Sequence, residues 1–247
     1  MSNTFSNISP KAKIGKGVKI ESFVTIGDDV EIGDNCWIGS NVSIMDGARI
    51  GNNCTIFPGA VISAIPQDLK FGGEKSIVKI GDNTTIREFV TINRATNYSG
   101  VTSVGENCLI MAYVHIAHDC HIANDVILVN SVQLGGHVEI AEHAIVGGIS
   151  AVHQFVKIGS YAMISGGSLV RKDVPPYIKA GREPMTYAGV NSIGLRRHSI
   201  ALIGAASVPR PYRTAGHSFK LYKTQECFPG RWTFTVQFVH FCISQIF

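Results

Sequence analysis

The chain has 247 residues, of which 45% are hydrophobic, and this composition indicates a folded protein rather than a disordered one. The net charge of +4 is confined to residues 198–247, so the balanced main body offers no basic surface for nucleic acid. No run of about 20 apolar residues predicts a membrane span, and the polar N-terminus lacks the apolar core of a secretory signal. Six cysteines without paired spacing indicate reduced thiols in a cytoplasmic protein.

A six-residue repeat organises most of the chain. Ile, Leu or Val opens successive hexads from Ile14 to Val61, again from Ile80, and from Ile110 to Leu169. A period of six fits neither a helical face, which repeats every 3.6 residues, nor strand alternation, which repeats every two. It predicts short strands joined by tight corners, and the frequent glycine at the second hexad position suggests that positive φ is needed there. The pattern resembles the hexapeptide-repeat family, whose fold is a left-handed parallel β-helix of triangular section with three hexads per coil.

Two polar, glycine-containing segments interrupt the repeat and return in phase. They are SAIPQDLKFGGEKSIVK, residues 63–79, and NRATNYSGVTS, residues 93–103. Loops on a rigid scaffold commonly carry binding groups. We therefore predict that both loops contribute to a site, with tolerated surface insertion as the alternative.

The composition changes abruptly after residue 197. Residues 198–247 contain nine aromatic residues, three prolines and one acid, with no clean helical period. Two explanations stay open, a reading-frame change near residue 198 and a divergent, natively folded tail. We therefore divide the chain into a β-helix domain, residues 1–190, and a C-terminal region, residues 191–247, whose segment TFTVQFVHFCISQIF favours aggregation.

The segment HIAHDCHI, which begins at His115, lies within the repeats. With 18 residues per coil, equivalent residues stack about 4.8 Å apart, which puts His115 beneath Gln133. The same stacking predicts one strip of candidate functional residues along a corner of the coil: His118, Asp119, Gly136, His137, His153 and Gln154.

Three interpretations of this strip stay open. In an acid–base centre, neutral His118 would deprotonate a hydroxyl, Asp119 would orient the imidazole, and the Gly136 N–H would stabilise an oxyanion. Direct acyl transfer from a thioester fits this set, since the sequence shows no nucleophilic elbow. In a zinc site, His118 and His137 would converge only across a subunit boundary, because they occupy different hexad positions. The third interpretation is a structural β-helix with solvated imidazoles.

From about Ile8 to Arg197 the chain resembles the UDP-N-acetylglucosamine O-acyltransferase family. The segments that carry the resemblance are IPQDLKFGGE, REFVTINRAT, HIAHDCHI, LGGHVEI, GGISAVHQFVKIG and VRKDVPPYIKAGREP. The resemblance implies an all-β left-handed parallel β-helix with a C-terminal appendage that is helical in relatives but atypical here. It also implies a cytoplasmic homotrimer, with no metal or other cofactor, that performs the first step of lipid A biosynthesis.

The resemblance further implies a role for each matching residue. An (R)-3-hydroxyacyl group would pass from acyl carrier protein to the 3-hydroxyl of UDP-N-acetylglucosamine, with His118 as base, Asp119 as its support and the Gly136 N–H at the oxyanion. Contacts to the two substrates are expected from Gln67, Asp68 and Lys70 across a subunit boundary, and from His115, His137, His153, Gln154 and Arg197. Gly166 matches the position that limits acyl length, and glycine there implies a long chain. Basic contacts to the acidic carrier protein are expected from Arg171, Lys172, Lys179 and Arg182.

The alternatives differ in chemistry. A zinc-dependent hydratase of the γ-carbonic-anhydrase type shares the fold, and a β-helix without catalysis would leave His118→Ala harmless. An amino-sugar N-acyltransferase usually carries an extra N-terminal domain, whereas the hexads here begin almost at once. Asn93 stands where relatives often carry histidine, which leaves the fine sugar contacts open. The sequence also leaves open the acyl length and whether the acceptor group is a 3-hydroxyl or a 3-amine.

Overall fold

The computed structural model describes residues 5–199, 217–222 and 235–242. The chain divides into two compact units, Met1–Ala188 and Gly189–Phe247. The reading-frame explanation concerns a region that lies largely outside the described residues. No helix in the described ranges is long and apolar enough to cross a membrane.

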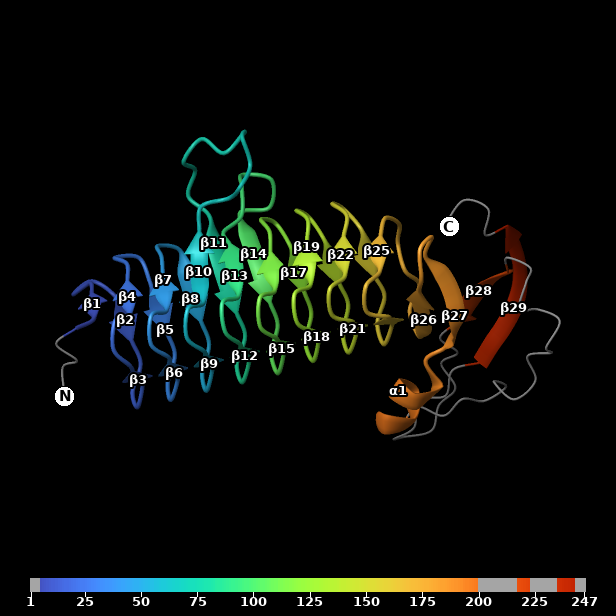
Figure 1. Ribbon diagram of the computed structural model, residues 1–247, viewed down its shortest axis with the longest axis horizontal. Helices are drawn as coiled ribbons and strands as arrows, with labels where there is room; N and C mark the ends of the chain where they lie inside the picture. The colour runs from blue at the N-terminus through green and yellow to red at the C-terminus, as the bar shows by residue number, and fades with distance from the viewer. Residues whose placement is uncertain (1–4, 200–216, 223–234, 243–247) are drawn as a thin grey trace. The chain divides into compact units, whose positions relative to one another are not determined.

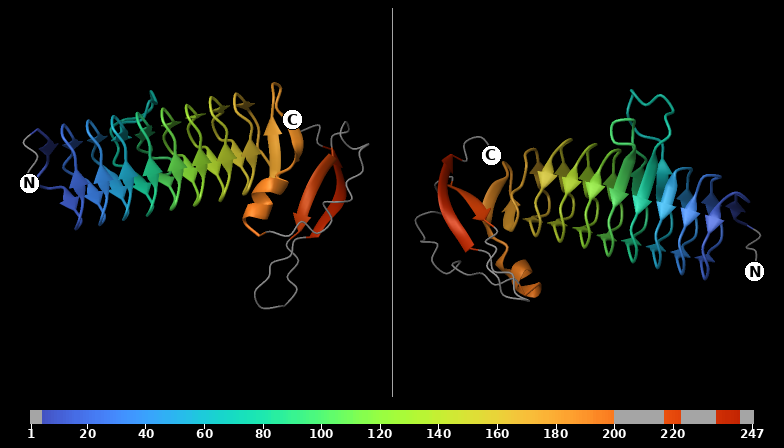
Figure 2. Two further views of the ribbon diagram at one scale, coloured as in Figure 1. Left: turned by 60° about the horizontal axis from the view of Figure 1, so that its bottom comes forward. Right: turned by 180° about the vertical axis from the view of Figure 1, so that it is seen from behind.

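The first unit is a parallel β-helix in which the chain passes in turn through three sheets, here called A, B and C (Figures 1 and 2). Sheet A contains β1 (Asn7–Ile8), β4 (Thr25–Ile26), β7 (Ser43–Ile44), β10 (Val61–Ala64), β13 (Thr91–Asn93), β16 (His115–Ile116), β19 (Gln133–Leu134), β22 (Ala151–Val152) and β25 (Leu169–Val170). Sheet B contains β2 (Lys13–Ile14), β5 (Glu31–Ile32), β8 (Ala48–Ile50), β11 (Ile77–Ile80), β14 (Val101–Val104), β17 (His121–Ile122), β20 (Glu139–Ile140) and β23 (Lys157–Ile158). Sheet C contains β3 (Lys19–Ile20), β6 (Trp37–Ile38), β9 (Thr55–Ile56), β12 (Thr85–Ile86), β15 (Leu109–Ile110), β18 (Ile127–Leu128), β21 (Ile145–Val146), β24 (Met163–Ile164), β26 (Ile178–Gly181) and β27 (Thr186–Val190).

The hexad pattern predicts the register of these sheets. Ile116 pairs with Leu134, which pairs with Val152, and all three are buried. Most first hexad residues thus point into a shared core, although Ile14 near the N-terminal end is exposed. The stacking of coils supplies this core, because one coil alone buries too little apolar surface to be stable. This arrangement confirms the predicted left-handed parallel β-helix.

The corners correct one expectation about glycine. Positive φ is found at the fourth hexad position, for example at Asn35, Asn53 and Asn107, where asparagine tolerates the left-handed conformation. Glycine at the second position has a different cause, since a Cβ on Gly33 would lie 2.6 Å from Asn52 Oδ1 and 2.7 Å from the carbonyl carbon of Gly51. The close approach of the next coil, rather than positive φ, excludes a side chain there.

Both interruptions leave the coil at the corner between sheets A and B. The first loop, residues 65–76, connects β10 to β11, and the second loop, residues 94–100, connects β13 to β14; both project from the coils in Figure 1. We call this corner, which runs through Asp119, His137 and Phe155, the A–B corner.

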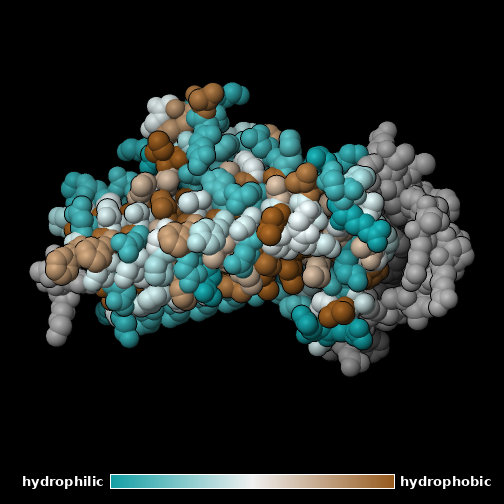
Figure 3. Space-filling view, in the orientation of Figure 1, coloured by the Kyte–Doolittle hydropathy of each residue, from teal (hydrophilic) through white to brown (hydrophobic). Residues whose placement is uncertain are grey.

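The outward faces of sheets B and C differ in chemistry. Sheet B carries charged side chains with ion pairs between adjacent strands, such as Lys13–Glu31 at 2.8 Å and Lys157–Glu139 at 3.0 Å. Sheet C instead stacks apolar residues from four successive strands: Leu109, Ile127, Ile145 and Met163. Figure 3 shows apolar side chains, in brown, at several places along the coils.

The described part of the second unit contains one helix and one strand pair. Helix α1 (Ser192–Arg197) begins after Asn191, whose side chain accepts a hydrogen bond from the Gly194 N–H at 3.2 Å. Strands β28 (His217–Tyr222) and β29 (Thr235–Cys242) pair antiparallel. In the first unit, Cys36, Cys54, Cys108 and Cys120 are buried free thiols.

Candidate active site

His118 lies in the turn after β16, directly against Gly136 of the next coil. A Cβ on Gly136 would lie 2.6 Å from Cε1 and 2.7 Å from Nε2 of His118, so only glycine leaves room for the ring. The His137 N–H donates to the His118 carbonyl at 3.1 Å and holds the two coils together. The predicted stacking of residues 118 and 136 is therefore present, and it leaves the His118 side chain buried.

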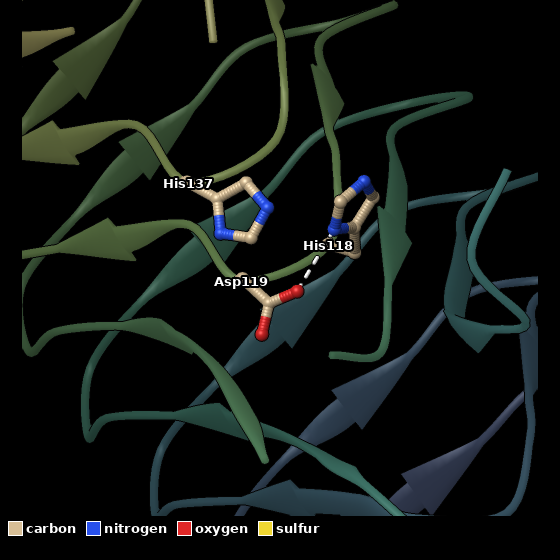
Figure 4. A group of neighbouring side chains, drawn as sticks. All are labelled: His118, Asp119 and His137. Atoms are coloured by element: carbon tan, nitrogen blue, oxygen red, sulfur yellow. Dashed lines mark hydrogen bonds and ion pairs between the residues drawn. The ribbon is translucent and has the colours of Figure 1, made fainter. Parts of the chain in front are cut away.

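The neighbouring carboxylate fixes the orientation and the tautomer of this imidazole. His118 Nδ1 lies 2.8 Å from Asp119 Oδ2 (Figure 4). An ionised carboxylate only accepts hydrogen bonds, so Nδ1 carries the hydrogen of the neutral ring and Nε2 keeps a lone pair. A positive φ of 58° at Asp119 turns its side chain back onto His118. The pair has the arrangement of an oriented general base.

Asp119 is ionised although it is almost completely buried. Burial alone would raise its pKa, but hydrogen bonds from Ser99, His118 and Thr96 outweigh burial and hold the pKa at about 2. Thr96 and Ser99 belong to the second loop, and the six-residue pattern predicts neither of them. The only signal for them was a hydroxyl-containing interruption of the hexads immediately before the HIAHDCHI coil.

A second imidazole stands edge-on to the first. The ring centroids of His137 and His118 are 5.0 Å apart with an interplanar angle of 88°. Phe155 stacks on His137 at 4.3 Å, and Tyr98 of the second loop contacts it edge-on at 4.5 Å. Burial lowers the pKa of His137 more than the nearby Asp119 charge raises it, so this ring is neutral at pH 7.

The first loop brings one of its three predicted residues to the base. Asp68 Oδ2 lies 4.0 Å from His118 Nε2 within one chain. The Lys70 N–H donates to Asp68 Oδ1 at 2.9 Å, which fixes the carboxylate in the loop. Gln67 and the Lys70 side chain are exposed. At 4.0 Å Asp68 and His118 do not hydrogen-bond to each other, so His118 Nε2 can accept the hydrogen of a substrate hydroxyl.

The remaining predicted residues are more dispersed. His115 lies on the outward face of sheet A, pairs with Gln133 as predicted, and has its Nδ1 2.7 Å from Thr91 Oγ1. Burial, together with the nearby His118, lowers the pKa of His115. Two other predicted residues, His153 and Gln154, follow β22 on the A–B corner and are exposed.

Gly166 lies on a different corner of the coil from His118, and Arg197 belongs to the second unit. Gly166 follows β24 at the corner between sheets C and A, and it is exposed there. Arg197 is the last residue of α1, in the second unit. Neither residue is therefore brought to His118 by the coil that carries the base.

One group of side chains has the composition of a metal site. His118, Asp119 and His137 offer ligand atoms within 4.8 Å of one another. The prediction that these histidines converge only across a subunit boundary is therefore wrong, because adjacent coils bring the third and fourth hexad positions together. However, both oxygens of Asp119 already accept hydrogen bonds, and His118 Nδ1 faces that carboxylate. The donor set fits an oriented base better than a zinc site, which requires three or four free ligands.

Comparison with known proteins gives two family matches. The family model described as bacterial transferase hexapeptide (six repeats) matches residues 29–64 and 102–136. A second, described as UDP N-acetylglucosamine O-acyltransferase, domain 2, matches residues 173–218.

Individual relatives agree with these matches. An acyl-[acyl-carrier-protein]–UDP-N-acetylglucosamine O-acyltransferase from Xanthomonas oryzae is 51% identical over 157 residues, which cover 63% of this chain and 60% of the relative. The corresponding protein from Verminephrobacter eiseniae is 42% identical with the same coverage, so the chain matches about 60% of the length of these curated relatives. A solved UDP-N-acetylglucosamine acyltransferase from Bacteroides fragilis is 52% identical, with a TM-score of 0.80 over 82% of this chain and 79% of that one. The Francisella novicida enzyme gives 43% identity and a TM-score of 0.79 over 81% and 74% of the two chains.

Proposed function

This chain belongs to the UDP-N-acetylglucosamine O-acyltransferase family, and we propose that it transfers an (R)-3-hydroxyacyl group from acyl carrier protein to the 3-hydroxyl of UDP-N-acetylglucosamine. The reaction would be the first step of lipid A biosynthesis and would take place in the cytoplasm. The observation that carries the proposal is the buried His118–Asp119 pair placed against the bare backbone of Gly136. Residues 1–190 would carry the chemistry.

The first step is attack on the thioester. The sugar hydroxyl would donate its proton to His118 Nε2 and attack the thioester carbonyl carbon as the proton leaves. Asp119 stays ionised and stabilises the imidazolium that forms. The carbonyl oxygen becomes an oxyanion, for which the Gly136 N–H is the proposed donor.

The second step restores the base. The tetrahedral intermediate collapses, the carbon–sulfur bond breaks, and the imidazolium returns its proton to the departing thiolate of the carrier protein. The products are the O-acylated sugar nucleotide and the free carrier thiol. A positioned base commonly contributes 10²–10⁴-fold to the rate, and one oxyanion donor about 10²–10³-fold.

The contrast between the outward faces of sheets B and C supports a homotrimer. The ion pairs of sheet B suit contact with water, whereas the apolar residues of sheet C suit contact with another copy. Gly166 lies on a different corner of the coil from His118. A neighbouring copy that presents its own Gly166 corner to the A–B corner would bring the acyl-limiting position and the base to one cleft. Light scattering tests this, and an active monomer would contradict it.

The two substrates would be bound by separate groups. Gln67, Asp68 and Lys70, with His115, His137, His153, Gln154 and Arg197, are the proposed contacts to the sugar nucleotide and acyl group. The acidic carrier protein would contact exposed basic residues such as Arg171 and Lys172. The absent side chain at Gly166 favours a long acyl chain, and activity restricted to short donors would contradict this.

One assay tests the proposed activity. Purified protein is incubated with UDP-N-acetylglucosamine and a series of short and long 3-hydroxyacyl carrier proteins, and product is measured by mass. We expect turnover with the long donors and a loss of at least about 100-fold for His118→Ala. Equal activity of the variant would exclude His118 as the base. A wild-type protein that is folded but inactive with every donor would refute the proposed function.

A further inference from the structure

The second loop contacts both the carboxylate that orients His118 and the neighbouring imidazole of His137. Thr96 and Ser99 donate to the Asp119 carboxylate, which in turn holds His118. Tyr98, between them in sequence, packs edge-on against His137. A tolerated surface insertion would not be expected to direct three of its residues at the Asp119 carboxylate and the His137 ring.

We propose that Thr96 and Ser99 are positioning residues that set the basicity of His118 by sharing the negative charge of Asp119. The inference rests on the proposed function of His118 as the base. It extends that function to two residues that touch neither the reacting atoms nor His118 itself.

The hydrogen bonds around Asp119 account for both carboxylate oxygens. Oδ2 accepts from the Thr96 N–H at 3.2 Å, from Thr96 Oγ1 at 2.8 Å and from His118 Nδ1 at 2.8 Å. Oδ1 accepts from the Ser99 N–H at 3.1 Å and from the Ser99 hydroxyl. Thr96 Oγ1 itself accepts from the Tyr98 N–H at 3.2 Å, which leaves its hydrogen directed at the carboxylate. His118 is thus one donor among five.

This sharing has a consequence for proton transfer. A carboxylate with five donors is a weak base, so it orients the Nδ1 hydrogen without drawing it away. Removing one hydroxyl donor would leave more negative charge on the two carboxylate oxygens of Asp119. Their attraction for an imidazolium at His118 would then be stronger. His118 would keep its proton to higher pH, so a smaller fraction of it would be neutral and able to accept the substrate proton near neutrality.

Other titratable groups also face this pair and must be held constant. Among the described residues, those that face His118 or Asp119 are Asp68 of the first loop, His115 on β16, His137 of the next coil and the buried thiol of Cys120. Neither Thr96 nor Ser99 is titratable, so their substitution changes the hydrogen bonds without adding or removing a charge at neutral pH.

The test compares Thr96→Val and Ser99→Ala with a matched deletion elsewhere. Ser103 is the control, because its Oγ lies 3.0 Å from Nδ1 of His121 on sheet B, so its deletion removes a hydroxyl that contacts a histidine away from Asp119. For Thr96→Val and Ser99→Ala, we expect the acid limb of the pH profile of kcat/KM to move up by roughly half to one pH unit. The Ser103→Ala profile should remain unchanged, and Thr96→Ser, which restores the hydroxyl, should return the limb to its original position.

A second measurement does not need turnover. Titration of ¹³C-labelled histidine by NMR follows His118 directly, with His118→Ala used to assign its signal. We expect the same upward movement in the midpoint for both hydroxyl deletions. An unchanged midpoint and acid limb in folded Thr96→Val protein would overturn the proposal, even if Ser99→Ala failed to fold. If wild-type protein showed no transfer, the proposed function would fail, while the NMR midpoints would still decide the role of the loop.

Discussion

A methyl group added at Gly136 should disable the base without replacing any ionisable residue. In Gly136→Ala the new Cβ would lie 2.6 Å from His118 Cε1, whereas ordinary contacts begin near 3.4 Å. The ring must therefore move by about 0.8 Å, because the new methyl group is bonded directly to the backbone and cannot turn away from it. The bond between His118 Nδ1 and Asp119 opposes that movement.

The expected loss follows from this displacement. Misplacement of a catalytic group by about 1 Å costs roughly 10²-fold in rate, which corresponds to about 2.7 kcal/mol of transition-state stabilisation. We expect kcat to fall by about that factor, while circular dichroism and thermal melting show that the coil is retained. Steady-state turnover with UDP-N-acetylglucosamine and a long 3-hydroxyacyl carrier protein provides the measurement.

A double-mutant comparison decides whether the loss has the proposed cause. In protein that already carries His118→Ala, the clash partner is absent, so Gly136→Ala should reduce the residual rate little further. Gly136→Ala protein with activity within threefold of wild type would refute the steric argument. A full 10²-fold loss in the His118→Ala background would instead show that the methyl group acts through another contact, such as the proposed oxyanion donor.

Three further predictions concern stability. The pKa of Asp119 is about 2 in the folded state against an ordinary 3.8, so its ionised form adds about 2 kcal/mol to the free energy of unfolding above pH 4. This contribution is lost as pH falls toward 2, and urea unfolding of Asp119→Asn should therefore show a flatter pH dependence between pH 4 and pH 2. Burial lowers the pKa of His137 below the ordinary 6.5, so the unfolded chain takes up the proton first and stability should decline below about pH 6.5, less so in His137→Gln. Ile116→Ala, in the fully buried core, should reduce the free energy of unfolding by about 2–5 kcal/mol in urea titrations, and a loss under 1 kcal/mol would contradict the close packing of the coil.

The repeat predicted contacts between particular residues. A fixed period determines register, so the repeat predicts that His115 lies against Gln133, and this pair is present. The stacking of His118 against Gly136 followed from the same rule. Periodicity predicts these contacts well because each coil repeats the backbone path of the coil before it.

The six-residue period does not predict the path of the two loops. Thr96 and Ser99 reach Asp119 because the second loop folds back on the A–B corner, and nothing in a six-residue pattern specifies that path. Hexad position also fails to predict that His118 and His137 converge within one chain. It does not describe how the positive φ at Asp119 turns the backbone between the two strands. Glycine at the second hexad position was assigned to positive φ, whereas the approach of the next coil determines it.

Within each sheet of the solenoid, a strand pairs only with the strands of the turn before it and the turn after it. Unravelling can therefore start at either terminus and proceed stepwise, and a turn in the middle opens only after its outer neighbours have come apart. The turns that carry Asp68, His118 and His137 have several others on each side within the first unit. Unfolding that begins at one end would therefore disrupt those outer turns first, and the turns that carry the candidate site would stay folded for longer.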